Sequence, residues 1–173
     1  MRIVSGSARG RRLVAPQGDK TRPTSDFVRE AIFNSLQSLV DLDGADVADV
    51  FAGTGALGIE ALSRGARTCV FVERDRDAVD AIRRNLATTK LDGGRVVHAD
   101  ALRWVATHGN RFDVAFADPP YDYHDWAVIG GLDADVLVVE SDREVDVGAH
   151  WAVQRTKRYG TTVVTLFVPR RPM

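Results

Sequence analysis

The sequence has few of the residues that mark exported, membrane-spanning or disulfide-bonded proteins. Its single cysteine, Cys69, excludes an internal disulfide and lies in an apolar run, where a core position is expected. No segment approaches the roughly 18 uncharged apolar residues of a membrane span, and the polar stretch after Met1 lacks the apolar region of a signal peptide. We therefore expect a cytoplasmic protein with no membrane segment.

Motifs for metal binding and nucleophilic catalysis are missing as well. The four histidines are scattered without the spacing of metal ligands, and no serine lies in a nucleophile-elbow pattern. We therefore predict no metal site. With 173 residues, 45% hydrophobic and 27% charged, the chain matches a globular protein with one core, and a monomer is the default expectation.

Acidic residues are rare at the two ends of the chain, although the formal net charge is only −1. Residues 1–29 contain seven basic and two acidic residues, and the segment from Gln154 onward contains five basic residues and no acid, so each segment has an excess of +5. A fold that brings the two ends together would present a phosphate-binding surface. The alternative is that these side chains only solvate exposed loops.

From Ala45 onward, strand-like and helical runs alternate along the chain. Such alternation predicts an α/β fold with a parallel sheet covered on both faces. Two further strand-like runs joined at Gly160 predict an antiparallel hairpin at one edge of that sheet. The parallel strands are expected at 45–51, 68–73, 95–100, 114–117 and 136–140, the helices at 59–64, 75–90 and through 102–105, and the hairpin at 151–159 and 161–168.

The N-terminal part has a different pattern. Residues 2–14 suggest a β-hairpin, which is marginal alone and must pack on the main body or on a partner. Thr24 or Ser25 is placed to cap a helix, whose apolar face starts at Val28 and whose end is expected near Gly44.

A glycine-rich segment follows the first parallel strand. Its spacing, Gly53-x-Gly55-x-x-Gly58, opens a helix, and Glu73 lies twenty positions after Gly53 at the end of the next strand. Glycines let a backbone approach a ligand closely, and the acid can accept the hydroxyls of a ribose. The pattern predicts an adenosine-containing cofactor, and by itself it fits NAD as well as S-adenosylmethionine.

Two further acidic positions favour S-adenosylmethionine. Asp49 precedes the glycines, where a carboxylate attracts the ammonium of a methionine moiety and repels a pyrophosphate. Asp100 and Ala101 follow the third strand and are placed to bind an adenine. Because the carboxyl ends of parallel strands share one edge, these acids, Glu73 and Asp118 are expected to converge. The alternative for each acid is that it caps the helix after its strand.

The segment Asp118-Pro119-Pro120-Tyr121 directly follows a strand-like run. The exocyclic amine of a base is a poor nucleophile because its lone pair is delocalised into the ring. The Asp118 carboxylate and the Pro119 carbonyl can each accept one N–H of such an amine and free the lone pair for attack on a methyl group. Tyr121 would stack on the base, and the two prolines fix the backbone.

Over nearly its full length, the chain resembles the RsmD-type bacterial ribosomal RNA methyltransferases. The central motifs occur in many amino-methyltransferases, whereas the N-terminal motifs narrow the resemblance to this family. The segments that carry it are Arg2–Gly6 with Gly10, Arg11 and Leu13, Thr21–Thr24 with Arg29–Asn34, Asp49–Gly58, Glu73, and Asp118–Tyr121.

The resemblance implies a class I S-adenosylmethionine-dependent methyltransferase fold, Rossmann-like, with seven mostly parallel strands and an antiparallel C-terminal hairpin. It implies transfer of a methyl group to the N2 amine of guanine 966 in 16S ribosomal RNA, within a small subunit or an assembly intermediate. Residues 1–20 are expected to form an RNA-binding hairpin extension, and 21–173 the methyltransferase domain. The expected site residues are Asp49, Gly53, Gly55, Glu73, Asp100 and Ala101 for the donor, Asp118, Pro119, Pro120 and Tyr121 for catalysis, and Arg2, Arg9, Arg11, Arg12 and Arg22 for RNA.

Two other functions stay open at this point, and the chain differs from the related enzymes in one respect. A DNA adenine-N6 methyltransferase would use the same Asp-Pro-Pro-Tyr segment but needs additional chain to read sequence, and a non-catalytic RNA- or nucleotide-binding domain could keep the fold. After Tyr121, and again between Ser141 and His150, the chain has little helical pattern. The helices that related enzymes place there are therefore expected to be short or absent.

Overall fold

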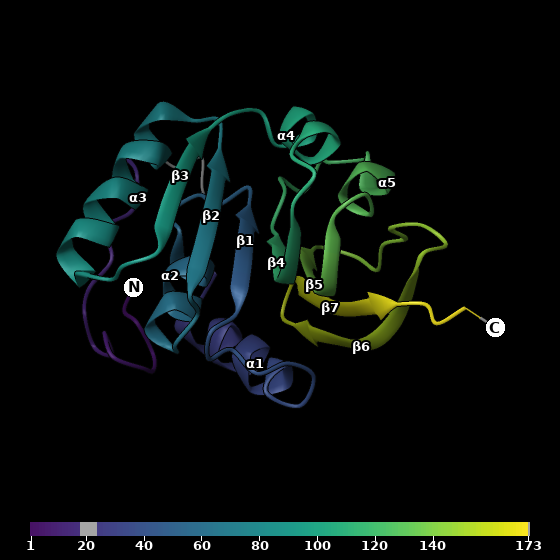
Figure 1. Cartoon of the computed structure of the whole chain (residues 1–173), viewed down its shortest axis with the longest axis horizontal. Coiled ribbons are helices and arrows are strands. Elements are labelled where there is room, and N and C mark those ends of the chain that lie inside the picture. Colours follow the sequence, from purple (N-terminus) through teal and green to yellow (C-terminus); the bar gives the residue numbers. More distant parts are fainter. Residues whose placement is uncertain (18–23, 173) are drawn as a thin grey trace.

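The computed structural model describes residues 1–17 and 24–172, and its centre is a sheet with helices on both faces (Figure 1). The strands lie in the order β3-β2-β1-β4-β5-β7-β6. The strands of the described residues are β1 (Asp46–Val50), β2 (Thr68–Glu73), β3 (Gly94–His98), β4 (Arg111–Ala117), β5 (Asp133–Ser141), β6 (Trp151–Tyr159) and β7 (Thr162–Pro169), and the helices are α1 (Asp26–Leu36), α2 (Ala56–Ser63), α3 (Arg76–Thr89), α4 (Ala101–Thr107) and α5 (Trp126–Ile129).

Strands β1 to β5 run parallel, and β7 pairs antiparallel with both β5 and β6. This arrangement confirms the predicted parallel sheet and its C-terminal hairpin. The central strands β1, β4 and β5 are apolar and buried on both faces, as expected of parallel strands covered by helices. Their carboxyl ends lie together at one edge of the sheet, which we call the carboxyl edge.

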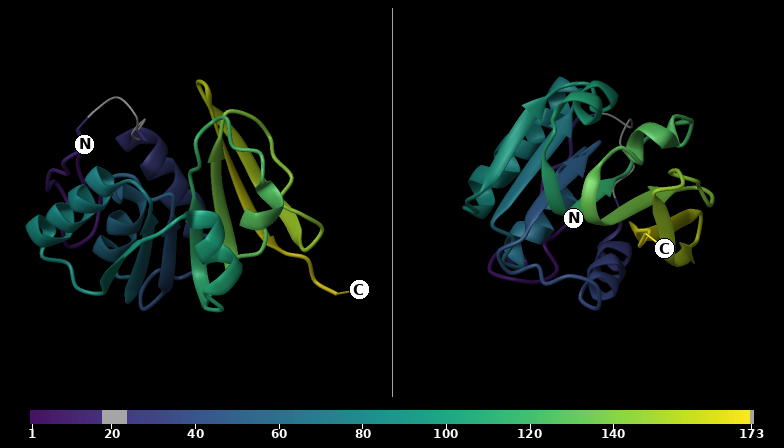
Figure 2. Two further views of the ribbon diagram at one scale, coloured as in Figure 1. Left: turned by 90° about the horizontal axis from the view of Figure 1, so that it is seen from above. Right: turned by 45° about the vertical axis from the view of Figure 1, so that its right-hand side comes forward.

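Apolar residues form a cluster on each face of the sheet. Helices α1, α2 and α3 contribute to the first cluster, and α4 and α5 contribute to the second. The sheet twists strongly, so that β6 and β7 run at a steep angle to β1, β2 and β3 (Figure 2). Cys69 is fully buried on β2, which confirms its predicted core position. Within residues 1–17 and 24–172, no helix has the length and apolar character needed to cross a bilayer.

Helix α1 is shorter than predicted. Its start is fixed by Ser25, one of the two predicted caps, whose hydroxyl accepts the Val28 N–H at 3.2 Å. The helix ends at Leu36 rather than near Gly44. The Ser38 hydroxyl donates back to a carbonyl of the last turn at 2.9 Å, which competes with continuation of the helix.

The helices expected to be short are indeed short. Helix α5, the only one between β4 and β5, has four residues, and residues 142–150, all of which are described, contain no helix. The loop that follows β4 therefore needs other contacts to hold its shape.

The predicted hairpin at residues 2–14 is only partly formed. A single antiparallel bridge joins Arg2 to Arg12, and residues 5–10 form turns and bends rather than strands. The bonded part of the hairpin ends at Ile3, because the amides of Val4 and Ser5 donate to Glu60 on α2. We call residues 1–14 the N-terminal strap because they are bound along α2 and α3.

Candidate functional site

The glycine-rich segment forms a tight loop between β1 and α2 at the carboxyl edge. Gly53 and Gly55 have φ values of 57° and 78°, in the left-handed region that favours glycine. A side chain at Gly58 would overlap the Phe71 ring and the Cys69 sulfur, so glycine permits α2 to pack closely on β2. A Cβ atom at Gly53 would meet no atom within 4 Å. The loop is therefore open at Gly53, where its backbone can meet a ligand.

Asp49 lies on β1 behind this loop and is 2% exposed. Its Oδ2 atom accepts the Gly58 N–H at 2.9 Å, which ties the first turn of α2 to the strand. Burial raises the pKa of Asp49 to about 8, against the opposing effect of the Gly58 bond and with a further contribution from the charges of Glu73 and Glu140. Without a ligand, the group is therefore largely neutral at pH 7.

Glu73 ends β2 and faces the glycine loop. Its Oε2 atom accepts the Gly53 N–H at 2.9 Å, and its Oε1 atom accepts the N–H groups of Arg74 and Asp75 at 2.8 and 2.9 Å. A carboxylate offers about four acceptor sites, so three bonds leave capacity for a hydroxyl. The structure thus brings Glu73 and Gly53 together, as their spacing suggests.

Asp100 and Ala101 lie where α4 begins. The Asp100 carboxylate accepts the Arg103 N–H at 3.1 Å and caps the helix, which is the alternative role left open by the sequence. Burial raises the pKa of Tyr123 to about 12, and the charges of Asp125 and Asp100 add to this shift. Asp100 therefore also lies near the loop after β4. Ala101 is buried.

The Asp118–Tyr121 segment leaves the end of β4 beside β1. The Asp118 N–H donates to the Val50 carbonyl at 3.4 Å, directly before the glycine loop. Asp118 is half-buried and Pro119 is buried, whereas Pro120 and Tyr121 are exposed. The predicted amine-binding segment and the predicted donor loop therefore leave adjacent strands at the same edge. In the described part of the chain, no group of three or more His, Cys, Asp or Glu side chains could hold a metal ion.

Two aromatic residues to which the sequence analysis gave no role connect these loops. Phe51 has a φ of 61°, which is uncommon for a bulky residue, and its ring centroid lies 5.4 Å from that of Tyr123. Tyr123 packs edge-on against Trp126 at 5.1 Å, and its hydroxyl donates to the Asp125 carbonyl at 2.8 Å. Unusual backbone conformations concentrate at functional sites. Phe51, at the start of the glycine loop, thus joins that loop to the loop after β4.

Arg143, after β5, is a further residue that sequence reasoning missed. Its guanidinium donates to the carbonyls of Tyr121 and Tyr123 at 3.2 and 3.1 Å, and it pairs with Asp142 at 2.6 Å. These bonds hold the loop after β4 where a long helix is absent. No local pattern signals this role, because Arg143 lies 22 and 20 residues from its two loop partners.

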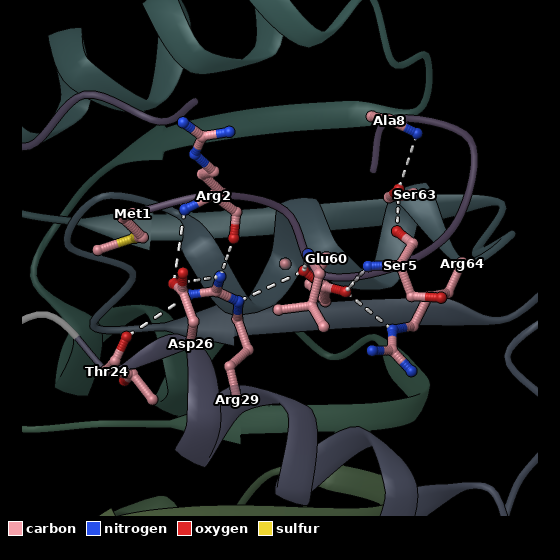
Figure 3. A network of polar contacts seen from close by, with 12 residues as sticks. Met1, Arg2, Ser5, Ala8, Thr24, Asp26, Arg29, Glu60, Ser63 and Arg64 are labelled. Atoms are coloured by element: carbon pink, nitrogen blue, oxygen red, sulfur yellow. Dashed lines mark hydrogen bonds and ion pairs between the residues drawn. The ribbon is translucent and has the colours of Figure 1, made fainter. Parts of the chain in front are cut away.

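Buried polar groups bind the N-terminal strap to α1 and α2 (Figure 3). Arg29 on α1 and Glu60 on α2 form an ion pair with no exposed side-chain surface. Arg29 was counted with the basic N-terminal residues, but it is buried and paired, so it adds no charge to the surface. The Glu60 carboxylate accepts four hydrogen bonds, from the N–H groups of Val4 and Ser5 at 2.9 Å each and from Nε of Arg29 and Arg64 at 3.3 and 3.0 Å.

Asn85 on α3 joins the strap to the glycine loop. Its Oδ1 atom accepts the Val14 N–H at 2.8 Å, and its Nδ2 atom donates to the carbonyls of Val14 and Thr54 at 3.0 Å each. Thr54 lies between Gly53 and Gly55, so the buried amide of Asn85 fixes both the strap and the glycine loop. The turn of the strap lies at the other end of α2, where the Ala8 N–H donates to Ser63 at 3.0 Å.

The arginines predicted to bind RNA are spread along this strap. Arg2, Arg9, Arg11 and Arg12 are exposed, and Arg22 lies outside the described residues. Arg2 and Arg12 form the bridge toward the glycine loop, whereas Arg9 lies in the turn near the opposite edge of the sheet. Nη1 of Arg11 donates to a carbonyl near the end of α3 at 2.8 Å.

Helix α1 separates the two basic ends of the chain. On one side, the Arg2 N–H lies 3.5 Å from the Asp26 carboxylate on α1. On the other side, Arg155 on β6 donates to the Ser35 hydroxyl of α1 at 3.2 Å. The strap and β6 therefore lie on either side of α1 (Figure 1), and among residues 1–17 and 24–172 the helix stands between the two groups of basic side chains.

Residues 1–168 match the model of a protein family described as "Conserved hypothetical protein 95". The chain belongs to this family. Among its relatives, "Ribosomal RNA small subunit methyltransferase D" of Escherichia coli (strain K12) is 36% identical over 178 residues, covering 96% of this chain and 89% of the relative. "Putative rRNA methyltransferase YlbH" of Bacillus subtilis (strain 168) is 37% identical over 190 residues, covering 98% and 100%. The family predicted from the sequence motifs is thereby confirmed.

Solved structures of family members and more distant proteins share the fold. "Putative methyltransferase yhhF from Escherichia coli" is 37% identical, with a TM-score of 0.86 and coverage of 98% of this chain and 97% of that one. A structure described as "a putative RNA methyltransferase" from Pyrococcus horikoshii is 21% identical, with a TM-score of 0.75 and coverage of 91% and 92%, and it supports the fold alone. The class I methyltransferase fold is thereby confirmed.

Proposed function

We propose that this family member transfers a methyl group from S-adenosylmethionine to the N2 amine of guanine 966 in 16S ribosomal RNA. Two relatives that match nearly all of the chain are named as methyltransferases of ribosomal RNA. The observation that carries the proposal is the bond from Asp118 to Val50, which sets the Asp-Pro-Pro-Tyr segment beside the glycine loop. A segment suited to an amine thus adjoins a loop suited to a donor.

The donor is held at the carboxyl ends of β1, β2 and β3. The open backbone at Gly53 fits a ligand pressed against it, and Glu73 beside it has acceptor capacity for ribose hydroxyls. Asp49 supplies the carboxylate for the methionine ammonium. When bound, S-adenosylmethionine supplies an electrophilic methyl group on its sulfonium. The proposed donor residues are Asp49, Gly53, Gly55, Glu73, Asp100 and Ala101.

The chain's own contribution to the reaction is to hold the amine. The Asp118 carboxylate and the Pro119 carbonyl each accept one N–H of the guanine amine, which draws its lone pair out of conjugation. Tyr121, which is 38% exposed, stacks on the base after it has turned out of its loop. Pro120 lacks an N–H and keeps the backbone in one conformation. Alkylation makes the amine more acidic, so no strong base is needed.

The RNA is held by positive charge outside the methyl-transfer site. In this proposal, residues 1–20 are an RNA-binding extension of a methyltransferase domain that comprises residues 21–173. The exposed arginines of the strap contact phosphates, and among them Arg2 and Arg12 lie toward the glycine loop. We propose a monomer that acts in the cytoplasm on RNA of the small subunit. The proposed RNA-binding residues are Arg2, Arg9, Arg11, Arg12 and Arg22.

Incubation with methyl-labelled S-adenosylmethionine and four separate acceptors tests this function. The acceptors are naked 16S RNA, partly assembled small subunits, complete small subunits and double-stranded DNA. We expect label in RNA from at least one ribosomal acceptor, at the N2 position of a single guanine by mass spectrometry of the nucleosides. Label in DNA adenine, or no label with any acceptor, would contradict the proposal.

The pH dependence of donor binding tests the role of Asp49. Its pKa of about 8 means that the free group is mainly protonated below pH 8. A nearby ammonium favours the carboxylate, so binding releases a proton, and affinity should rise with pH by at most about tenfold per unit until it levels off above the free pKa. Calorimetry with S-adenosylhomocysteine in buffers of different ionisation enthalpy measures both effects. In Asp49→Asn, the rise of donor affinity with pH should disappear. If the affinity of the wild type does not rise with pH, Asp49 does not bind the ammonium of the donor.

Variants of Arg143 test how the loop after β4 is held. Arg143→Ala removes two bonds to loop carbonyls, so we expect the KM for RNA to rise about tenfold, as for loss of hydrogen bonds to a charged group. Arg143→Lys should behave similarly, because an ammonium lacks the fork that bridges two carbonyls. Arg111→Ala, which removes an exposed cation at the opposite edge, is the control. The affinity of Arg143→Ala for the donor should equal that of the wild type. A KM for RNA equal to that of the wild type would contradict the positioning role of Arg143.

A further inference from the structure

Phe27 is a large apolar side chain that α1 leaves outside the core. It is 70% exposed, the highest value among the large apolar side chains in the described part of the chain, whereas its neighbour Val28 is 7% exposed. Single exposed apolar residues are common, so exposure alone supports no conclusion. The surroundings of Phe27 supply further observations.

The Phe27 ring lies against Tyr159 at the end of β6. The two ring centroids are 6.0 Å apart and the planes meet at 79°, an edge-to-face pair. Tyr159 is half-buried against the core cluster beneath it, so it is fixed in place. The pair thus presents aromatic surface from two elements that are far apart in the sequence.

The pair lies at the carboxyl edge, as do the residues proposed to hold the amine. Ala117, at the end of β4, shares a row of the sheet with Thr156 on β6, and Tyr159 lies three residues further in the same direction. Three strand spacings, about 14 Å, separate β4 from β6, and Tyr159 lies a further three residues, about 10 Å, along β6. A few nucleotides of an extended single strand can span this distance.

Strand β6 supplies positive charge on the Tyr159 side of the pair, whereas α1 carries the exposed acid Glu30 one turn from Phe27. Arg155, Lys157 and Arg158 are exposed, and neither β6 nor β7 contains an acidic residue. Alternation along the strand places Lys157 on the same face as Tyr159, and Arg158 on the other face. We call Phe27, Tyr159 and Lys157 the β6 platform.

We propose that the β6 platform binds single-stranded RNA, with a base near the target guanine stacked on Phe27 and an adjoining phosphate on Lys157. Aromatic rings flanked by cations hold unpaired bases in this way. The basic strand favours a polyanion over a segment of a ribosomal protein. This inference rests on the proposed function and extends it, because it gives the RNA a second contact on the side of α1 opposite the strap.

Three variants of Phe27 and one of Lys157, made in the full chain, test the platform. Phe27→Ala removes the ring, Phe27→Leu keeps an apolar side chain without a ring, and Phe27→Trp keeps a ring. Val153→Ala shortens an exposed apolar side chain that lies on β6 outside the platform, and it is the matched control. Binding of a single-stranded RNA fragment centred on the target is measured by fluorescence anisotropy, at one salt concentration for the Phe27 and Val153 variants and over a series of salt concentrations for the wild type and Lys157→Ala. Donor affinity and thermal stability are measured for each variant.

Loss of stacking by one base should weaken RNA binding about tenfold in the alanine and leucine variants. The tryptophan variant should bind like the wild type, and its added fluorescence should be quenched when RNA binds. Donor affinity and thermal stability should not change in any variant, because Phe27 lies outside the core. Lys157→Ala should reduce the slope of log K against log salt concentration by about one, the amount expected for the loss of one phosphate contact.

Each contrary result overturns the platform. Wild-type affinity in the alanine variant would show that no base stacks there, and wild-type affinity in the leucine variant would show simple apolar burial. A defect with assembled small subunits but not with the RNA fragment would assign the platform to a ribosomal protein. Failure of the proposed function has a separate signature, because the wild type would then not methylate RNA, whereas failure of the platform leaves methylation intact in all Phe27 variants.

Discussion

Replacing Asp118 with alanine should lower kcat for methyl transfer by about 10²–10³-fold or more, comparable to loss of one group that stabilises a transition state in other enzymes. In the proposed mechanism, the carboxylate is the acceptor that draws the amine lone pair out of conjugation, together with the Pro119 carbonyl. Asp118 lies outside the glycine loop, so affinity for S-adenosylhomocysteine should stay within about twofold of the wild type. Single-turnover transfer to the ribosomal acceptor and calorimetry with S-adenosylhomocysteine measure the two quantities.

Two further variants sharpen this prediction. Asp122→Ala removes a carboxylate from an exposed position four residues along the same loop and should leave kcat nearly unchanged. Asp118→Asn keeps one acceptor oxygen but presents an amide that cannot accept a hydrogen bond, so its kcat should lie between those of the wild type and the alanine variant. Near wild-type turnover in Asp118→Ala would remove the basis of the proposed chemistry.

Glu60→Ala should destabilise the protein by about 3–5 kcal/mol, as expected when one partner of a buried ion pair is removed. The variant leaves the Arg29 guanidinium buried with Asp26 as its remaining ion-pair partner, and it removes the acceptor for the amides of Val4 and Ser5. Such a loss is large against the roughly 5–15 kcal/mol by which domains are stable. Urea unfolding followed by circular dichroism measures it.

The exposed pair of Arg67 with Asp46 provides the control. Arg67 is 67% exposed in this pair, and Arg67→Ala should cost less than about 1 kcal/mol. Native-state hydrogen exchange adds a local test, because in Glu60→Ala the amides of Val4 and Ser5 should lose protection before the sheet does. Equal urea midpoints for Glu60→Ala and the wild type would show that the buried pair does not hold the strap.

The sheet and its glycine loop could be predicted because their signals are local. β-branched runs mark the buried strands, and the spacing of Gly53, Gly55 and Gly58 reflects the backbone of a single loop. The roles of the acids were less certain for the same reason: Asp100 caps α4, and Asp49 bonds to Gly58, whatever else they bind. A local pattern cannot separate a cap from a ligand-binding group.

The contacts that join distant segments could not be predicted. Arg143 holds the carbonyls of Tyr121 and Tyr123, yet nothing near it in the sequence indicates a partner. Arg29 was counted as surface charge, although it lies one turn before Phe33 on the buried face of α1. The position of Arg29 on the apolar face of α1 could have predicted a buried ion pair, because a buried cation needs an acidic partner. Which acid it pairs with is decided by the tertiary fold.

The anchoring of the strap has a consequence for synthesis of the protein. The partners of its first residues come much later in the chain, since Val4 and Glu60 are separated by 56 positions and Val14 and Asn85 by 71. A nascent chain that is translated only as far as β2 lacks Asn85, so Val14 cannot yet be bound. Closing these long loops costs chain entropy, so we expect the N-terminus to dock late, after α3 has emerged and packed.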